Sequence, residues 1–257
     1  MKPPDIRIAV AARKGGVGKT TTATGIADLL ASRGLATALV DLDPQSNAAF
    51  ALGADPKAAG TAHLLLGNPV TPTTVRAGLD VFAGGPELVS HRIEALDPME
   101  LRDAVGRLDY QAIVFDCPPG IECLERQAVV ASTCALIVLD AHPFAVVGAR
   151  RVYESIVSRR ARGRTAPGRI AVVAGRLDLR RSADRELEGA LASGFPDAAV
   201  LRLRQDALLA AATADRLPIS TLPADSRGRI DLEIITSWIT ESHRESKPNQ
   251  LQHEPKP

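Results

Sequence analysis

The chain has 257 residues, a formal net charge of +1, 45% hydrophobic residues and 3% aromatic residues. That length suits one large α/β domain whose core is built mainly from aliphatic side chains. No apolar run approaches the roughly 18–20 residues that a membrane-spanning helix needs, and the N-terminal sequence MKPPDIRIAV lacks the pattern of a signal peptide. We therefore exclude an integral membrane protein and expect a cytoplasmic one.

Apolar runs alternate with longer amphipathic segments along the whole chain. This alternation predicts βαβ units in a single domain, with a mostly parallel twisted sheet flanked by helices on both faces. Strands are expected at 6–12, 36–41, 79–83, 110–116, 134–139, 169–174 and 198–203. Helices are expected at 19–32, 98–107, 122–131, 144–160, 181–192, 205–213 and 226–243, with one short helix between loops in 52–76. The domain is expected to cover 1–241, and the polar segment 242–257 to be a disordered tail.

A glycine-rich segment, KGGVGKTT, lies between the first expected strand and the first expected helix. In that context the segment favours a P-loop, in which backbone amides and a helix N-terminus converge on phosphate. Lys19 would reach the β- and γ-phosphates, and the Thr20 hydroxyl would bind Mg²⁺. The position usually held by the first glycine is Arg13, and a second lysine follows it. The expected nucleotide-binding residues are Lys14, Gly15, Gly16, Val17, Gly18, Lys19, Thr20 and Thr21.

Three carboxylates close two other apolar strands. Asp41 and Asp43 end the run ALVDLD, and residues two apart on a strand face the same side. Asp116 ends the run AIVFD, as expected of a carboxylate that holds Mg²⁺ through water. In a parallel sheet these strand ends meet at the phosphate crevice. Turn acids are common singly, but three of them downstream of a P-loop favour an Mg²⁺-dependent nucleotide site.

Together these segments resemble the ParA/MinD ATPases, which carry a deviant P-loop. The resemblance rests on KGGVGKTT at 14–21, DLDPQ at 41–45 and DCPP at 116–119, with weaker likeness at 217–219 and 226–228. It implies an ATP-dependent homodimer in which Lys14 crosses to the partner's phosphates. It also implies that Asp43 positions the attacking water and that Asp41 organises the Mg²⁺ shell. Lys14, Lys19 and Asp43 are then the catalytic residues of a slow, partner-stimulated ATPase.

The DNA-segregation branch of that family binds double-stranded DNA without sequence preference, through basic residues of its C-terminal half. Residues 141–229 of this chain hold 16 arginines, no lysines and nine acidic residues. The resemblance therefore implies nucleoid association and plasmid or chromosome segregation with a ParB-like partner. The amphipathic C-terminal helix of the membrane branch is absent from the tail sequence, so no membrane contact is expected. Candidate DNA contacts are Arg180, Arg181, Arg202, Arg204, Arg227 and Arg229.

Other functions stay open at this point. The same ATPase cycle could position another cargo on the nucleoid, nucleotide could act only as a binding switch, or the chain could be a metabolic or metal-handling enzyme. Cys117, Cys123 and Cys134 lack the spacing of a cluster-binding pair, and we expect them to be small buried apolar residues. The chain also departs from the family where the adenine is bound, with Gly175-Arg176 and Arg204-Gln205-Asp206, so no adenine contact is assigned.

Overall fold

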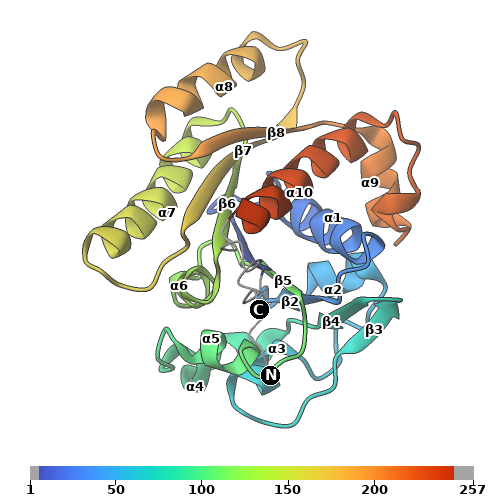
Figure 1. The fold of residues 1–257 in the computed structure, drawn as a ribbon, viewed down its shortest axis with the longest axis vertical. Coiled ribbons are helices and arrows are strands. Elements are labelled where there is room, and N and C mark those ends of the chain that lie inside the picture. The colour runs from blue at the N-terminus through green and yellow to red at the C-terminus, as the bar shows by residue number, and fades with distance from the viewer. Residues whose placement is uncertain (1–5, 246–257) are drawn as a thin grey trace, which may run out of the picture.

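The computed structural model describes residues 6–245, and its centre is an eight-stranded sheet (Figure 1). All neighbouring strands are parallel except the edge pair β3–β4, which is antiparallel. The strand order is β3-β4-β2-β5-β1-β6-β7-β8. The strands are β1 (Ile6–Ala11), β2 (Thr37–Asp41), β3 (Thr73–Arg76), β4 (Leu79–Phe82), β5 (Ala112–Asp116), β6 (Cys134–Leu139), β7 (Arg169–Leu177) and β8 (Ala199–Arg204).

Helices cover both faces of this sheet, which confirms the predicted α/β class. One face carries α1, α2, α9 and α10, and the other carries α5, α6, α7 and α8 (Figure 1). The helices are α1 (Lys19–Ser32), α2 (Asn47–Leu52), α3 (Thr61–Leu65), α4 (His91–Glu94), α5 (Glu100–Val105), α6 (Glu122–Ala131), α7 (Pro143–Ala161), α8 (Ser182–Gly194), α9 (Ala207–Ala214) and α10 (Arg227–Glu245). Two 3₁₀ turns are η1 (Pro86–Val89) and η2 (Ile219–Thr221).

The central strands are buried on both sides. β2, β5 and β6 are buried at every position, and β1 at every position except Arg7. Strands covered on both faces read as continuous aliphatic runs rather than as alternating patterns, which is why their positions could be predicted from the sequence. Because all four strands run in the same direction, the residues that follow them gather at one edge of the sheet.

The seven predicted strands and seven predicted helices are present, but several smaller elements were missed. The segment 52–76 contains the predicted short helix, α3, and also the edge strand β3. β3 has four half-buried or exposed residues and pairs only with β4, so it has no apolar pattern to reveal it. α10 continues beyond residue 241, the predicted end of the domain, and the predicted disorder of 246–257 falls outside the described residues.

The three cysteines differ in burial, so we expect them to differ in reactivity. Cys117 is 0% exposed and Cys134 is 4% exposed, whereas Cys123 in the first turn of α6 is half-buried. Burial raises the pKa of Cys117 well above the ordinary thiol value and that of Cys134 to about 12. Because the thiolate is the reactive form, a maleimide should label Cys123 of the native protein and spare the other two. Mass spectrometry of digested protein checks this, and equal labelling of all three would contradict the burial.

Candidate nucleotide site

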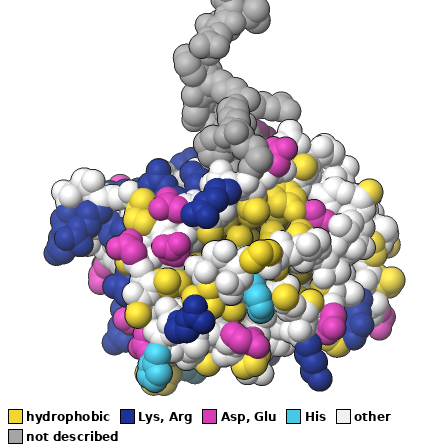
Figure 2. Space-filling model, turned by 90° about the horizontal axis from the view of Figure 1, so that it is seen from below, with side chains coloured by type: hydrophobic (Ala, Val, Ile, Leu, Met, Phe, Trp, Pro, Cys, Tyr) yellow, Lys and Arg dark blue, Asp and Glu magenta, His cyan; other side chains and the backbone are white. Residues whose placement is uncertain are grey.

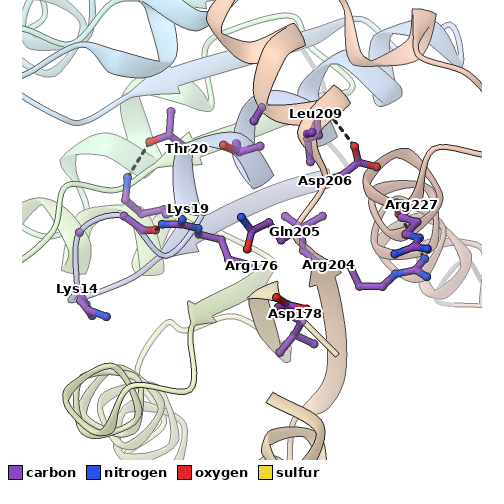
Figure 3. A pocket seen from close by; sticks show the side chains of 18 of the residues that line it. Lys14, Lys19, Thr20, Arg176, Asp178, Arg204, Gln205, Asp206, Leu209 and Arg227 are labelled. Atoms are coloured by element: carbon purple, nitrogen blue, oxygen red, sulfur yellow. Dashed lines mark hydrogen bonds between the residues drawn. The ribbon is translucent and has the colours of Figure 1, made fainter. Parts of the chain in front are cut away.

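A large cleft opens at the carboxyl edge of the sheet, between the P-loop and the ends of β7 and β8 (Figure 3). Its volume is about 1470 Å³, which is ample for a nucleoside triphosphate. The P-loop joins β1 to α1, and Gly16 (φ 77°) and Gly18 (φ 99°) adopt left-handed backbone conformations that favour glycine. All the predicted P-loop residues except the buried Val17 line the cleft, as do Asp43 and Asn47.

A buried ion pair lies at the base of the P-loop. Lys19 Nζ is 2.8 Å from Asp116 Oδ1, and Thr20 Oγ1 donates to Asp116 Oδ2 over 2.8 Å. Burial disfavours the charged ammonium and lowers the pKa of Lys19, whereas the nearby Asp116 carboxylate raises it. The effect of Asp116 is the larger, so the pKa of Lys19 lies above its ordinary value. Burial raises the pKa of Asp116, and Lys19 opposes that rise. The structure therefore brings together three residues that the sequence analysis assigned to phosphate and Mg²⁺.

The other two predicted carboxylates have different surroundings. Asp41 is 0% exposed, and its oxygens accept hydrogen bonds from the backbone N–H groups of Asp43, Ala48 and Ala49. Burial and the nearby Asp116 charge raise the pKa of Asp41 to about 7. Asp43 is 7% exposed and lines the cleft, while its Oδ1 accepts only the N–H of Gln45. Asp41 thus anchors the start of α2, and Asp43 has an oxygen available to a group in the cleft.

The two basic residues that begin the deviant P-loop each have an acidic partner. Lys14 Nζ lies 2.7 Å from Asp140 Oδ2, and both side chains are partly exposed. Arg13 binds Glu122 at 2.5 Å and Glu125 at 2.9 Å, both on α6. Asp140 was not predicted as a site residue, although it directly follows the apolar strand β6 in the same way that Asp41 and Asp116 end theirs. That shared position at a strand end was a signal that could have revealed it.

The departures at Gly175 and Arg176 have a structural reason. A Cβ on Gly175 would lie 2.3 Å from the Val17 carbonyl oxygen, so the P-loop packs too closely for any other residue. Arg176 has φ 54° and donates from Nη1 to the Gly16 carbonyl oxygen over 2.8 Å. In the second departure, Arg204, Gln205 and Asp206 all line the cleft, and Asp206 also caps α9 (Figure 3). This contact of Arg176 with the P-loop was not predicted from the sequence.

The six candidate DNA-contacting arginines do not form one uniform surface. Arg204 makes a bidentate pair with the fully buried side chain of Asp231, at 2.7 Å for the shortest contact. Arg229 donates to the Leu222 carbonyl, Arg180 pairs with Asp178, and Arg202 lies 3.7 Å from Glu188. Arg181 and Arg227 are exposed and form no ion pair among the described residues. Much of the donor capacity of this set is therefore used within the fold.

The donor set fits a nucleotide-bound Mg²⁺ better than a metal held by protein alone. Among residues 6–245, no group of three or more His, Cys, Asp and Glu side chains is arranged to hold a metal ion. Thr20 and Asp116 instead offer hard oxygen atoms beside the phosphate-binding loop, which suits an ion that shares its ligands with phosphate and water. No helix in the described part of the chain combines the length and apolarity needed to cross a membrane.

Comparison with known proteins agrees with this geometry. A protein-family model described as "AAA domain" matches residues 6–165. The chromosome-partitioning ATPase Soj of Thermus thermophilus is 38% identical over 144 residues, and the match spans 55% of this chain and 57% of Soj. The chain belongs to the ParA/MinD family of P-loop ATPases. The alignment with Soj thus covers just over half of that protein's length.

Solved structures share the fold over nearly the whole chain. An ATP complex of McdA from Cyanothece superposes with a TM-score of 0.77 at 21% identity, covering 97% of this chain and 100% of that one. MinD of Pyrococcus horikoshii, complexed with Mg-ADP, gives a TM-score of 0.74 at 20% identity, covering 94% and 97% of the two chains. At these identities the likeness establishes the fold, which confirms the predicted single-domain P-loop architecture.

Proposed function

We propose that this chain is a ParA-like ATPase that dimerises on ATP, binds DNA nonspecifically and segregates plasmid or chromosomal DNA with a ParB-like partner. The observation that carries the proposal is the position of Lys14, a second lysine at the exposed mouth of the P-loop cleft. An ordinary P-loop needs only the buried lysine, here Lys19. A further cation at the mouth of the cleft is suited to the phosphates of a nucleotide in a second copy of the chain.

Different cleft residues would bind the phosphates, bind Mg²⁺ and promote the hydrolysis of ATP. The P-loop amides and Lys19 would hold the β- and γ-phosphates, and Thr20 with Asp116 would hold Mg²⁺, which offsets negative charge on the phosphates. Asp43 would orient a water molecule and accept its proton, since its carboxylate lines the cleft and is only lightly hydrogen-bonded. Lys14 of the partner would add positive charge where charge develops in the transition state.

Four exposed apolar side chains lie toward the same edge of the sheet as the cleft, and they support a dimer that closes over it. We call Phe50, Phe144, Leu179 and Leu208 the apolar rim, with exposed fractions of 44%, 78%, 42% and 49%. Each follows a different parallel strand of the sheet, so all four lie toward its carboxyl edge. Exposed large apolar side chains on the same face as a charged cleft are typical of protein–protein interfaces. A second copy facing the cleft would bury the rim together with both nucleotides.

The names of the relatives favour DNA segregation as the use of this cycle, since Soj and the ParA of Myxococcus xanthus, 36% identical, are both chromosome-partitioning proteins. In this proposal ATP binding forms the DNA-bound dimer on the nucleoid. Slow hydrolysis, stimulated by the ParB-like partner, then releases the dimer from DNA. The basic segment 141–229 provides the positive charge that nonspecific DNA binding requires.

Replacing Lys14 with alanine tests the dimer. Lys14 and Asp140 form a partly exposed ion pair, so its loss should change the free energy of unfolding by no more than about 1 kcal/mol. ATP binding by the monomer should persist, whereas ATP-dependent dimerisation and turnover should be lost. Light scattering after size-exclusion chromatography, with ATP and with ADP, measures the change. A Lys14→Ala protein that still dimerises on ATP would contradict the proposed role of Lys14 in the partner's site.

A further inference from the structure

The cations that line the nucleotide cleft differ in whether they have an acidic partner. Those that contact a carboxylate are Lys14, Lys19, Arg180 and Arg204. Arg176 and Arg227 also line the cleft, but neither forms an ion pair within the described part of the chain. On the end of the molecule that carries α4 and α5, by contrast, Lys and Arg side chains lie among Asp and Glu side chains (Figure 2). Of the two unpaired cations, Arg176 is the one that contacts the P-loop.

The backbone at Arg176 departs from regular strand geometry. The register between β7 and β8 shifts between Gly175 and Leu177, so Arg176 is an extra residue that pairs with no residue of β8. Its φ of 54° is a left-handed conformation, which disfavours every residue that has a Cβ. Bulges beside active sites redirect a side chain, and strained residues cluster at sites that bind ligands. Folding stability alone would favour glycine here, so it does not account for the arginine.

The side chain of Arg176 lies along the P-loop. Its Nη1 donates to the Gly16 carbonyl over 2.8 Å, and its Cγ lies 3.7 Å from the position that a Cβ on Gly18 would take. Figure 3 shows Arg176 between Lys19 and Gln205 in the cleft. The hydrogen bond to Gly16 uses one of the five N–H groups of a guanidinium. Stabilising the P-loop therefore leaves donors of Arg176 available to a ligand in the cleft.

The strand order indicates which part of a nucleotide lies beside Arg176. Asp43 and Asp116 lie at the ends of β2 and β5, on one side of β1, and mark the end of the cleft for Mg²⁺ and the γ-phosphate. Arg176 lies near the end of β7, on the other side of β1. Most of the other lining residues follow β7 and β8, which leaves that side for the ribose and the base. A cation between these two ends lies beside the phosphate nearest the ribose.

We propose that Arg176 binds the α-phosphate of the nucleotide, an assignment that rests on the nucleotide site of the proposed function. The N–H groups of a guanidinium match phosphate oxygens in geometry, and their hydrogen bonds to an anion are stronger than neutral ones. Because ATP and ADP both carry an α-phosphate, Arg176 should contribute equally to the binding of each. It should therefore lower KM for ATP without changing kcat.

Arg176→Gln tests this assignment, because the glutamine amide can still donate to the Gly16 carbonyl while the positive charge is lost. Isothermal calorimetry with ADP and with ATP, each with Mg²⁺, measures the two affinities over a salt series. Both affinities should fall by about 10-fold, and by the same factor. They should also depend less on salt than in the unchanged protein, since one charge–charge contact is gone. In a turnover assay, KM should rise by that factor at constant kcat.

Arg176→Gly and Arg216→Gly form a matched pair that controls for backbone strain and net charge. Arg216 is also exposed and left-handed, with φ 59°, but it follows α9, and its guanidinium lies 4.0 Å from the centre of the Phe50 ring. Each substitution removes one positive charge and allows the left-handed backbone without strain. Arg176→Gly should lose affinity for ADP, whereas Arg216→Gly should bind ADP as the unchanged protein does.

The other outcomes would each reject the assignment or the proposed function. Unchanged affinities in Arg176→Gln would leave Arg176 as a support of the P-loop only, and a loss confined to ATP would place it at the γ-phosphate. A loss of affinity with unaltered salt dependence would indicate an uncharged contact, such as stacking on the base. Each of these results would overturn the α-phosphate assignment, as would failure of the unchanged protein to bind either nucleotide. ADP binding requires neither a dimer nor DNA. If ATP drives neither dimerisation nor DNA binding while Arg176→Gln still weakens ADP binding, the proposed function fails and the assignment of Arg176 stands.

Discussion

Replacing Lys19 with methionine should abolish ATP binding and also lower the free energy of unfolding of the nucleotide-free protein, by about 3–5 kcal/mol. The reason is the buried pair of Lys19, 7% exposed, with Asp116, 0% exposed. Without the ammonium, the Asp116 carboxylate is left as an uncompensated buried charge, with the Thr20 hydroxyl as its remaining side-chain donor. Isothermal calorimetry with ATP and urea denaturation measure the two effects separately.

A double variant separates the loss of ATP binding from the loss of folding stability. The double variant Lys19→Met/Asp116→Asn removes the unpaired charge, so it should recover most of the lost stability while ATP binding stays absent. Asp116→Asn alone keeps an oxygen that can accept from Lys19 and should cost less stability than Lys19→Met. If Lys19→Met retains ATP-dependent binding to DNA, the P-loop assignment is wrong. If its stability is unchanged, the Lys19–Asp116 pair does not contribute as its burial indicates.

Replacing Asp43 with alanine should slow ATP turnover by about 10²–10⁴-fold, the range that a positioned acid or base contributes. ATP binding and dimerisation should persist, because the phosphates are held by the P-loop and not by Asp43. The variant should therefore remain on DNA once ATP has loaded it. Phosphate release measures turnover, and the lifetime of the DNA complex after removal of free ATP measures trapping.

Asp41→Asn separates the structural role of Asp41 from the role proposed for Asp43. The Asp41 oxygens accept three backbone N–H groups and hold the start of α2, so this change should lower stability as well as any contribution of Asp41 to the Mg²⁺ shell. A single thermal-unfolding experiment distinguishes the two variants, since Asp43→Ala should melt close to the unchanged protein. Normal turnover in Asp43→Ala would move the proton-accepting role to another residue.

Two kinds of feature could be predicted from the sequence: the strands that are buried on both faces and the carboxylates at their ends. Continuous aliphatic runs located β1, β2, β5 and β6, and the carboxylates that close β2 and β5 lie at the same edge as the P-loop. The edge strand β3 was missed because its short, half-exposed pairing leaves no apolar pattern. The hydrophobic pattern of the sequence also cannot show which residues far apart in the chain contact each other. Examples are the ion pair of Lys14 with Asp140 and the hydrogen bond from Arg176 to the Gly16 carbonyl.

The arginines illustrate the same limit. Composition showed that residues 141–229 are basic, yet not which of their charges are neutralised. Arg204 was chosen because it lies near a strand end, but its guanidinium is paired with the buried Asp231. Arg162 and Arg164, which belong to the same basic segment, were not chosen and form no ion pair among the described residues. Only the three-dimensional arrangement separates arginines that stabilise the fold from arginines with free donors.

ATP-dependent retention on DNA tests the central proposal most directly. The unchanged protein should retard a random-sequence duplex far more strongly with ATP and Mg²⁺ than with ADP and Mg²⁺, and the difference should weaken steeply as salt rises, because counterion release dominates nonspecific binding. The ATP-dependent part should vanish in Lys14→Ala and persist longer in Asp43→Ala. Equal retardation with ATP and ADP in the unchanged protein would contradict the proposal that ATP controls its association with DNA.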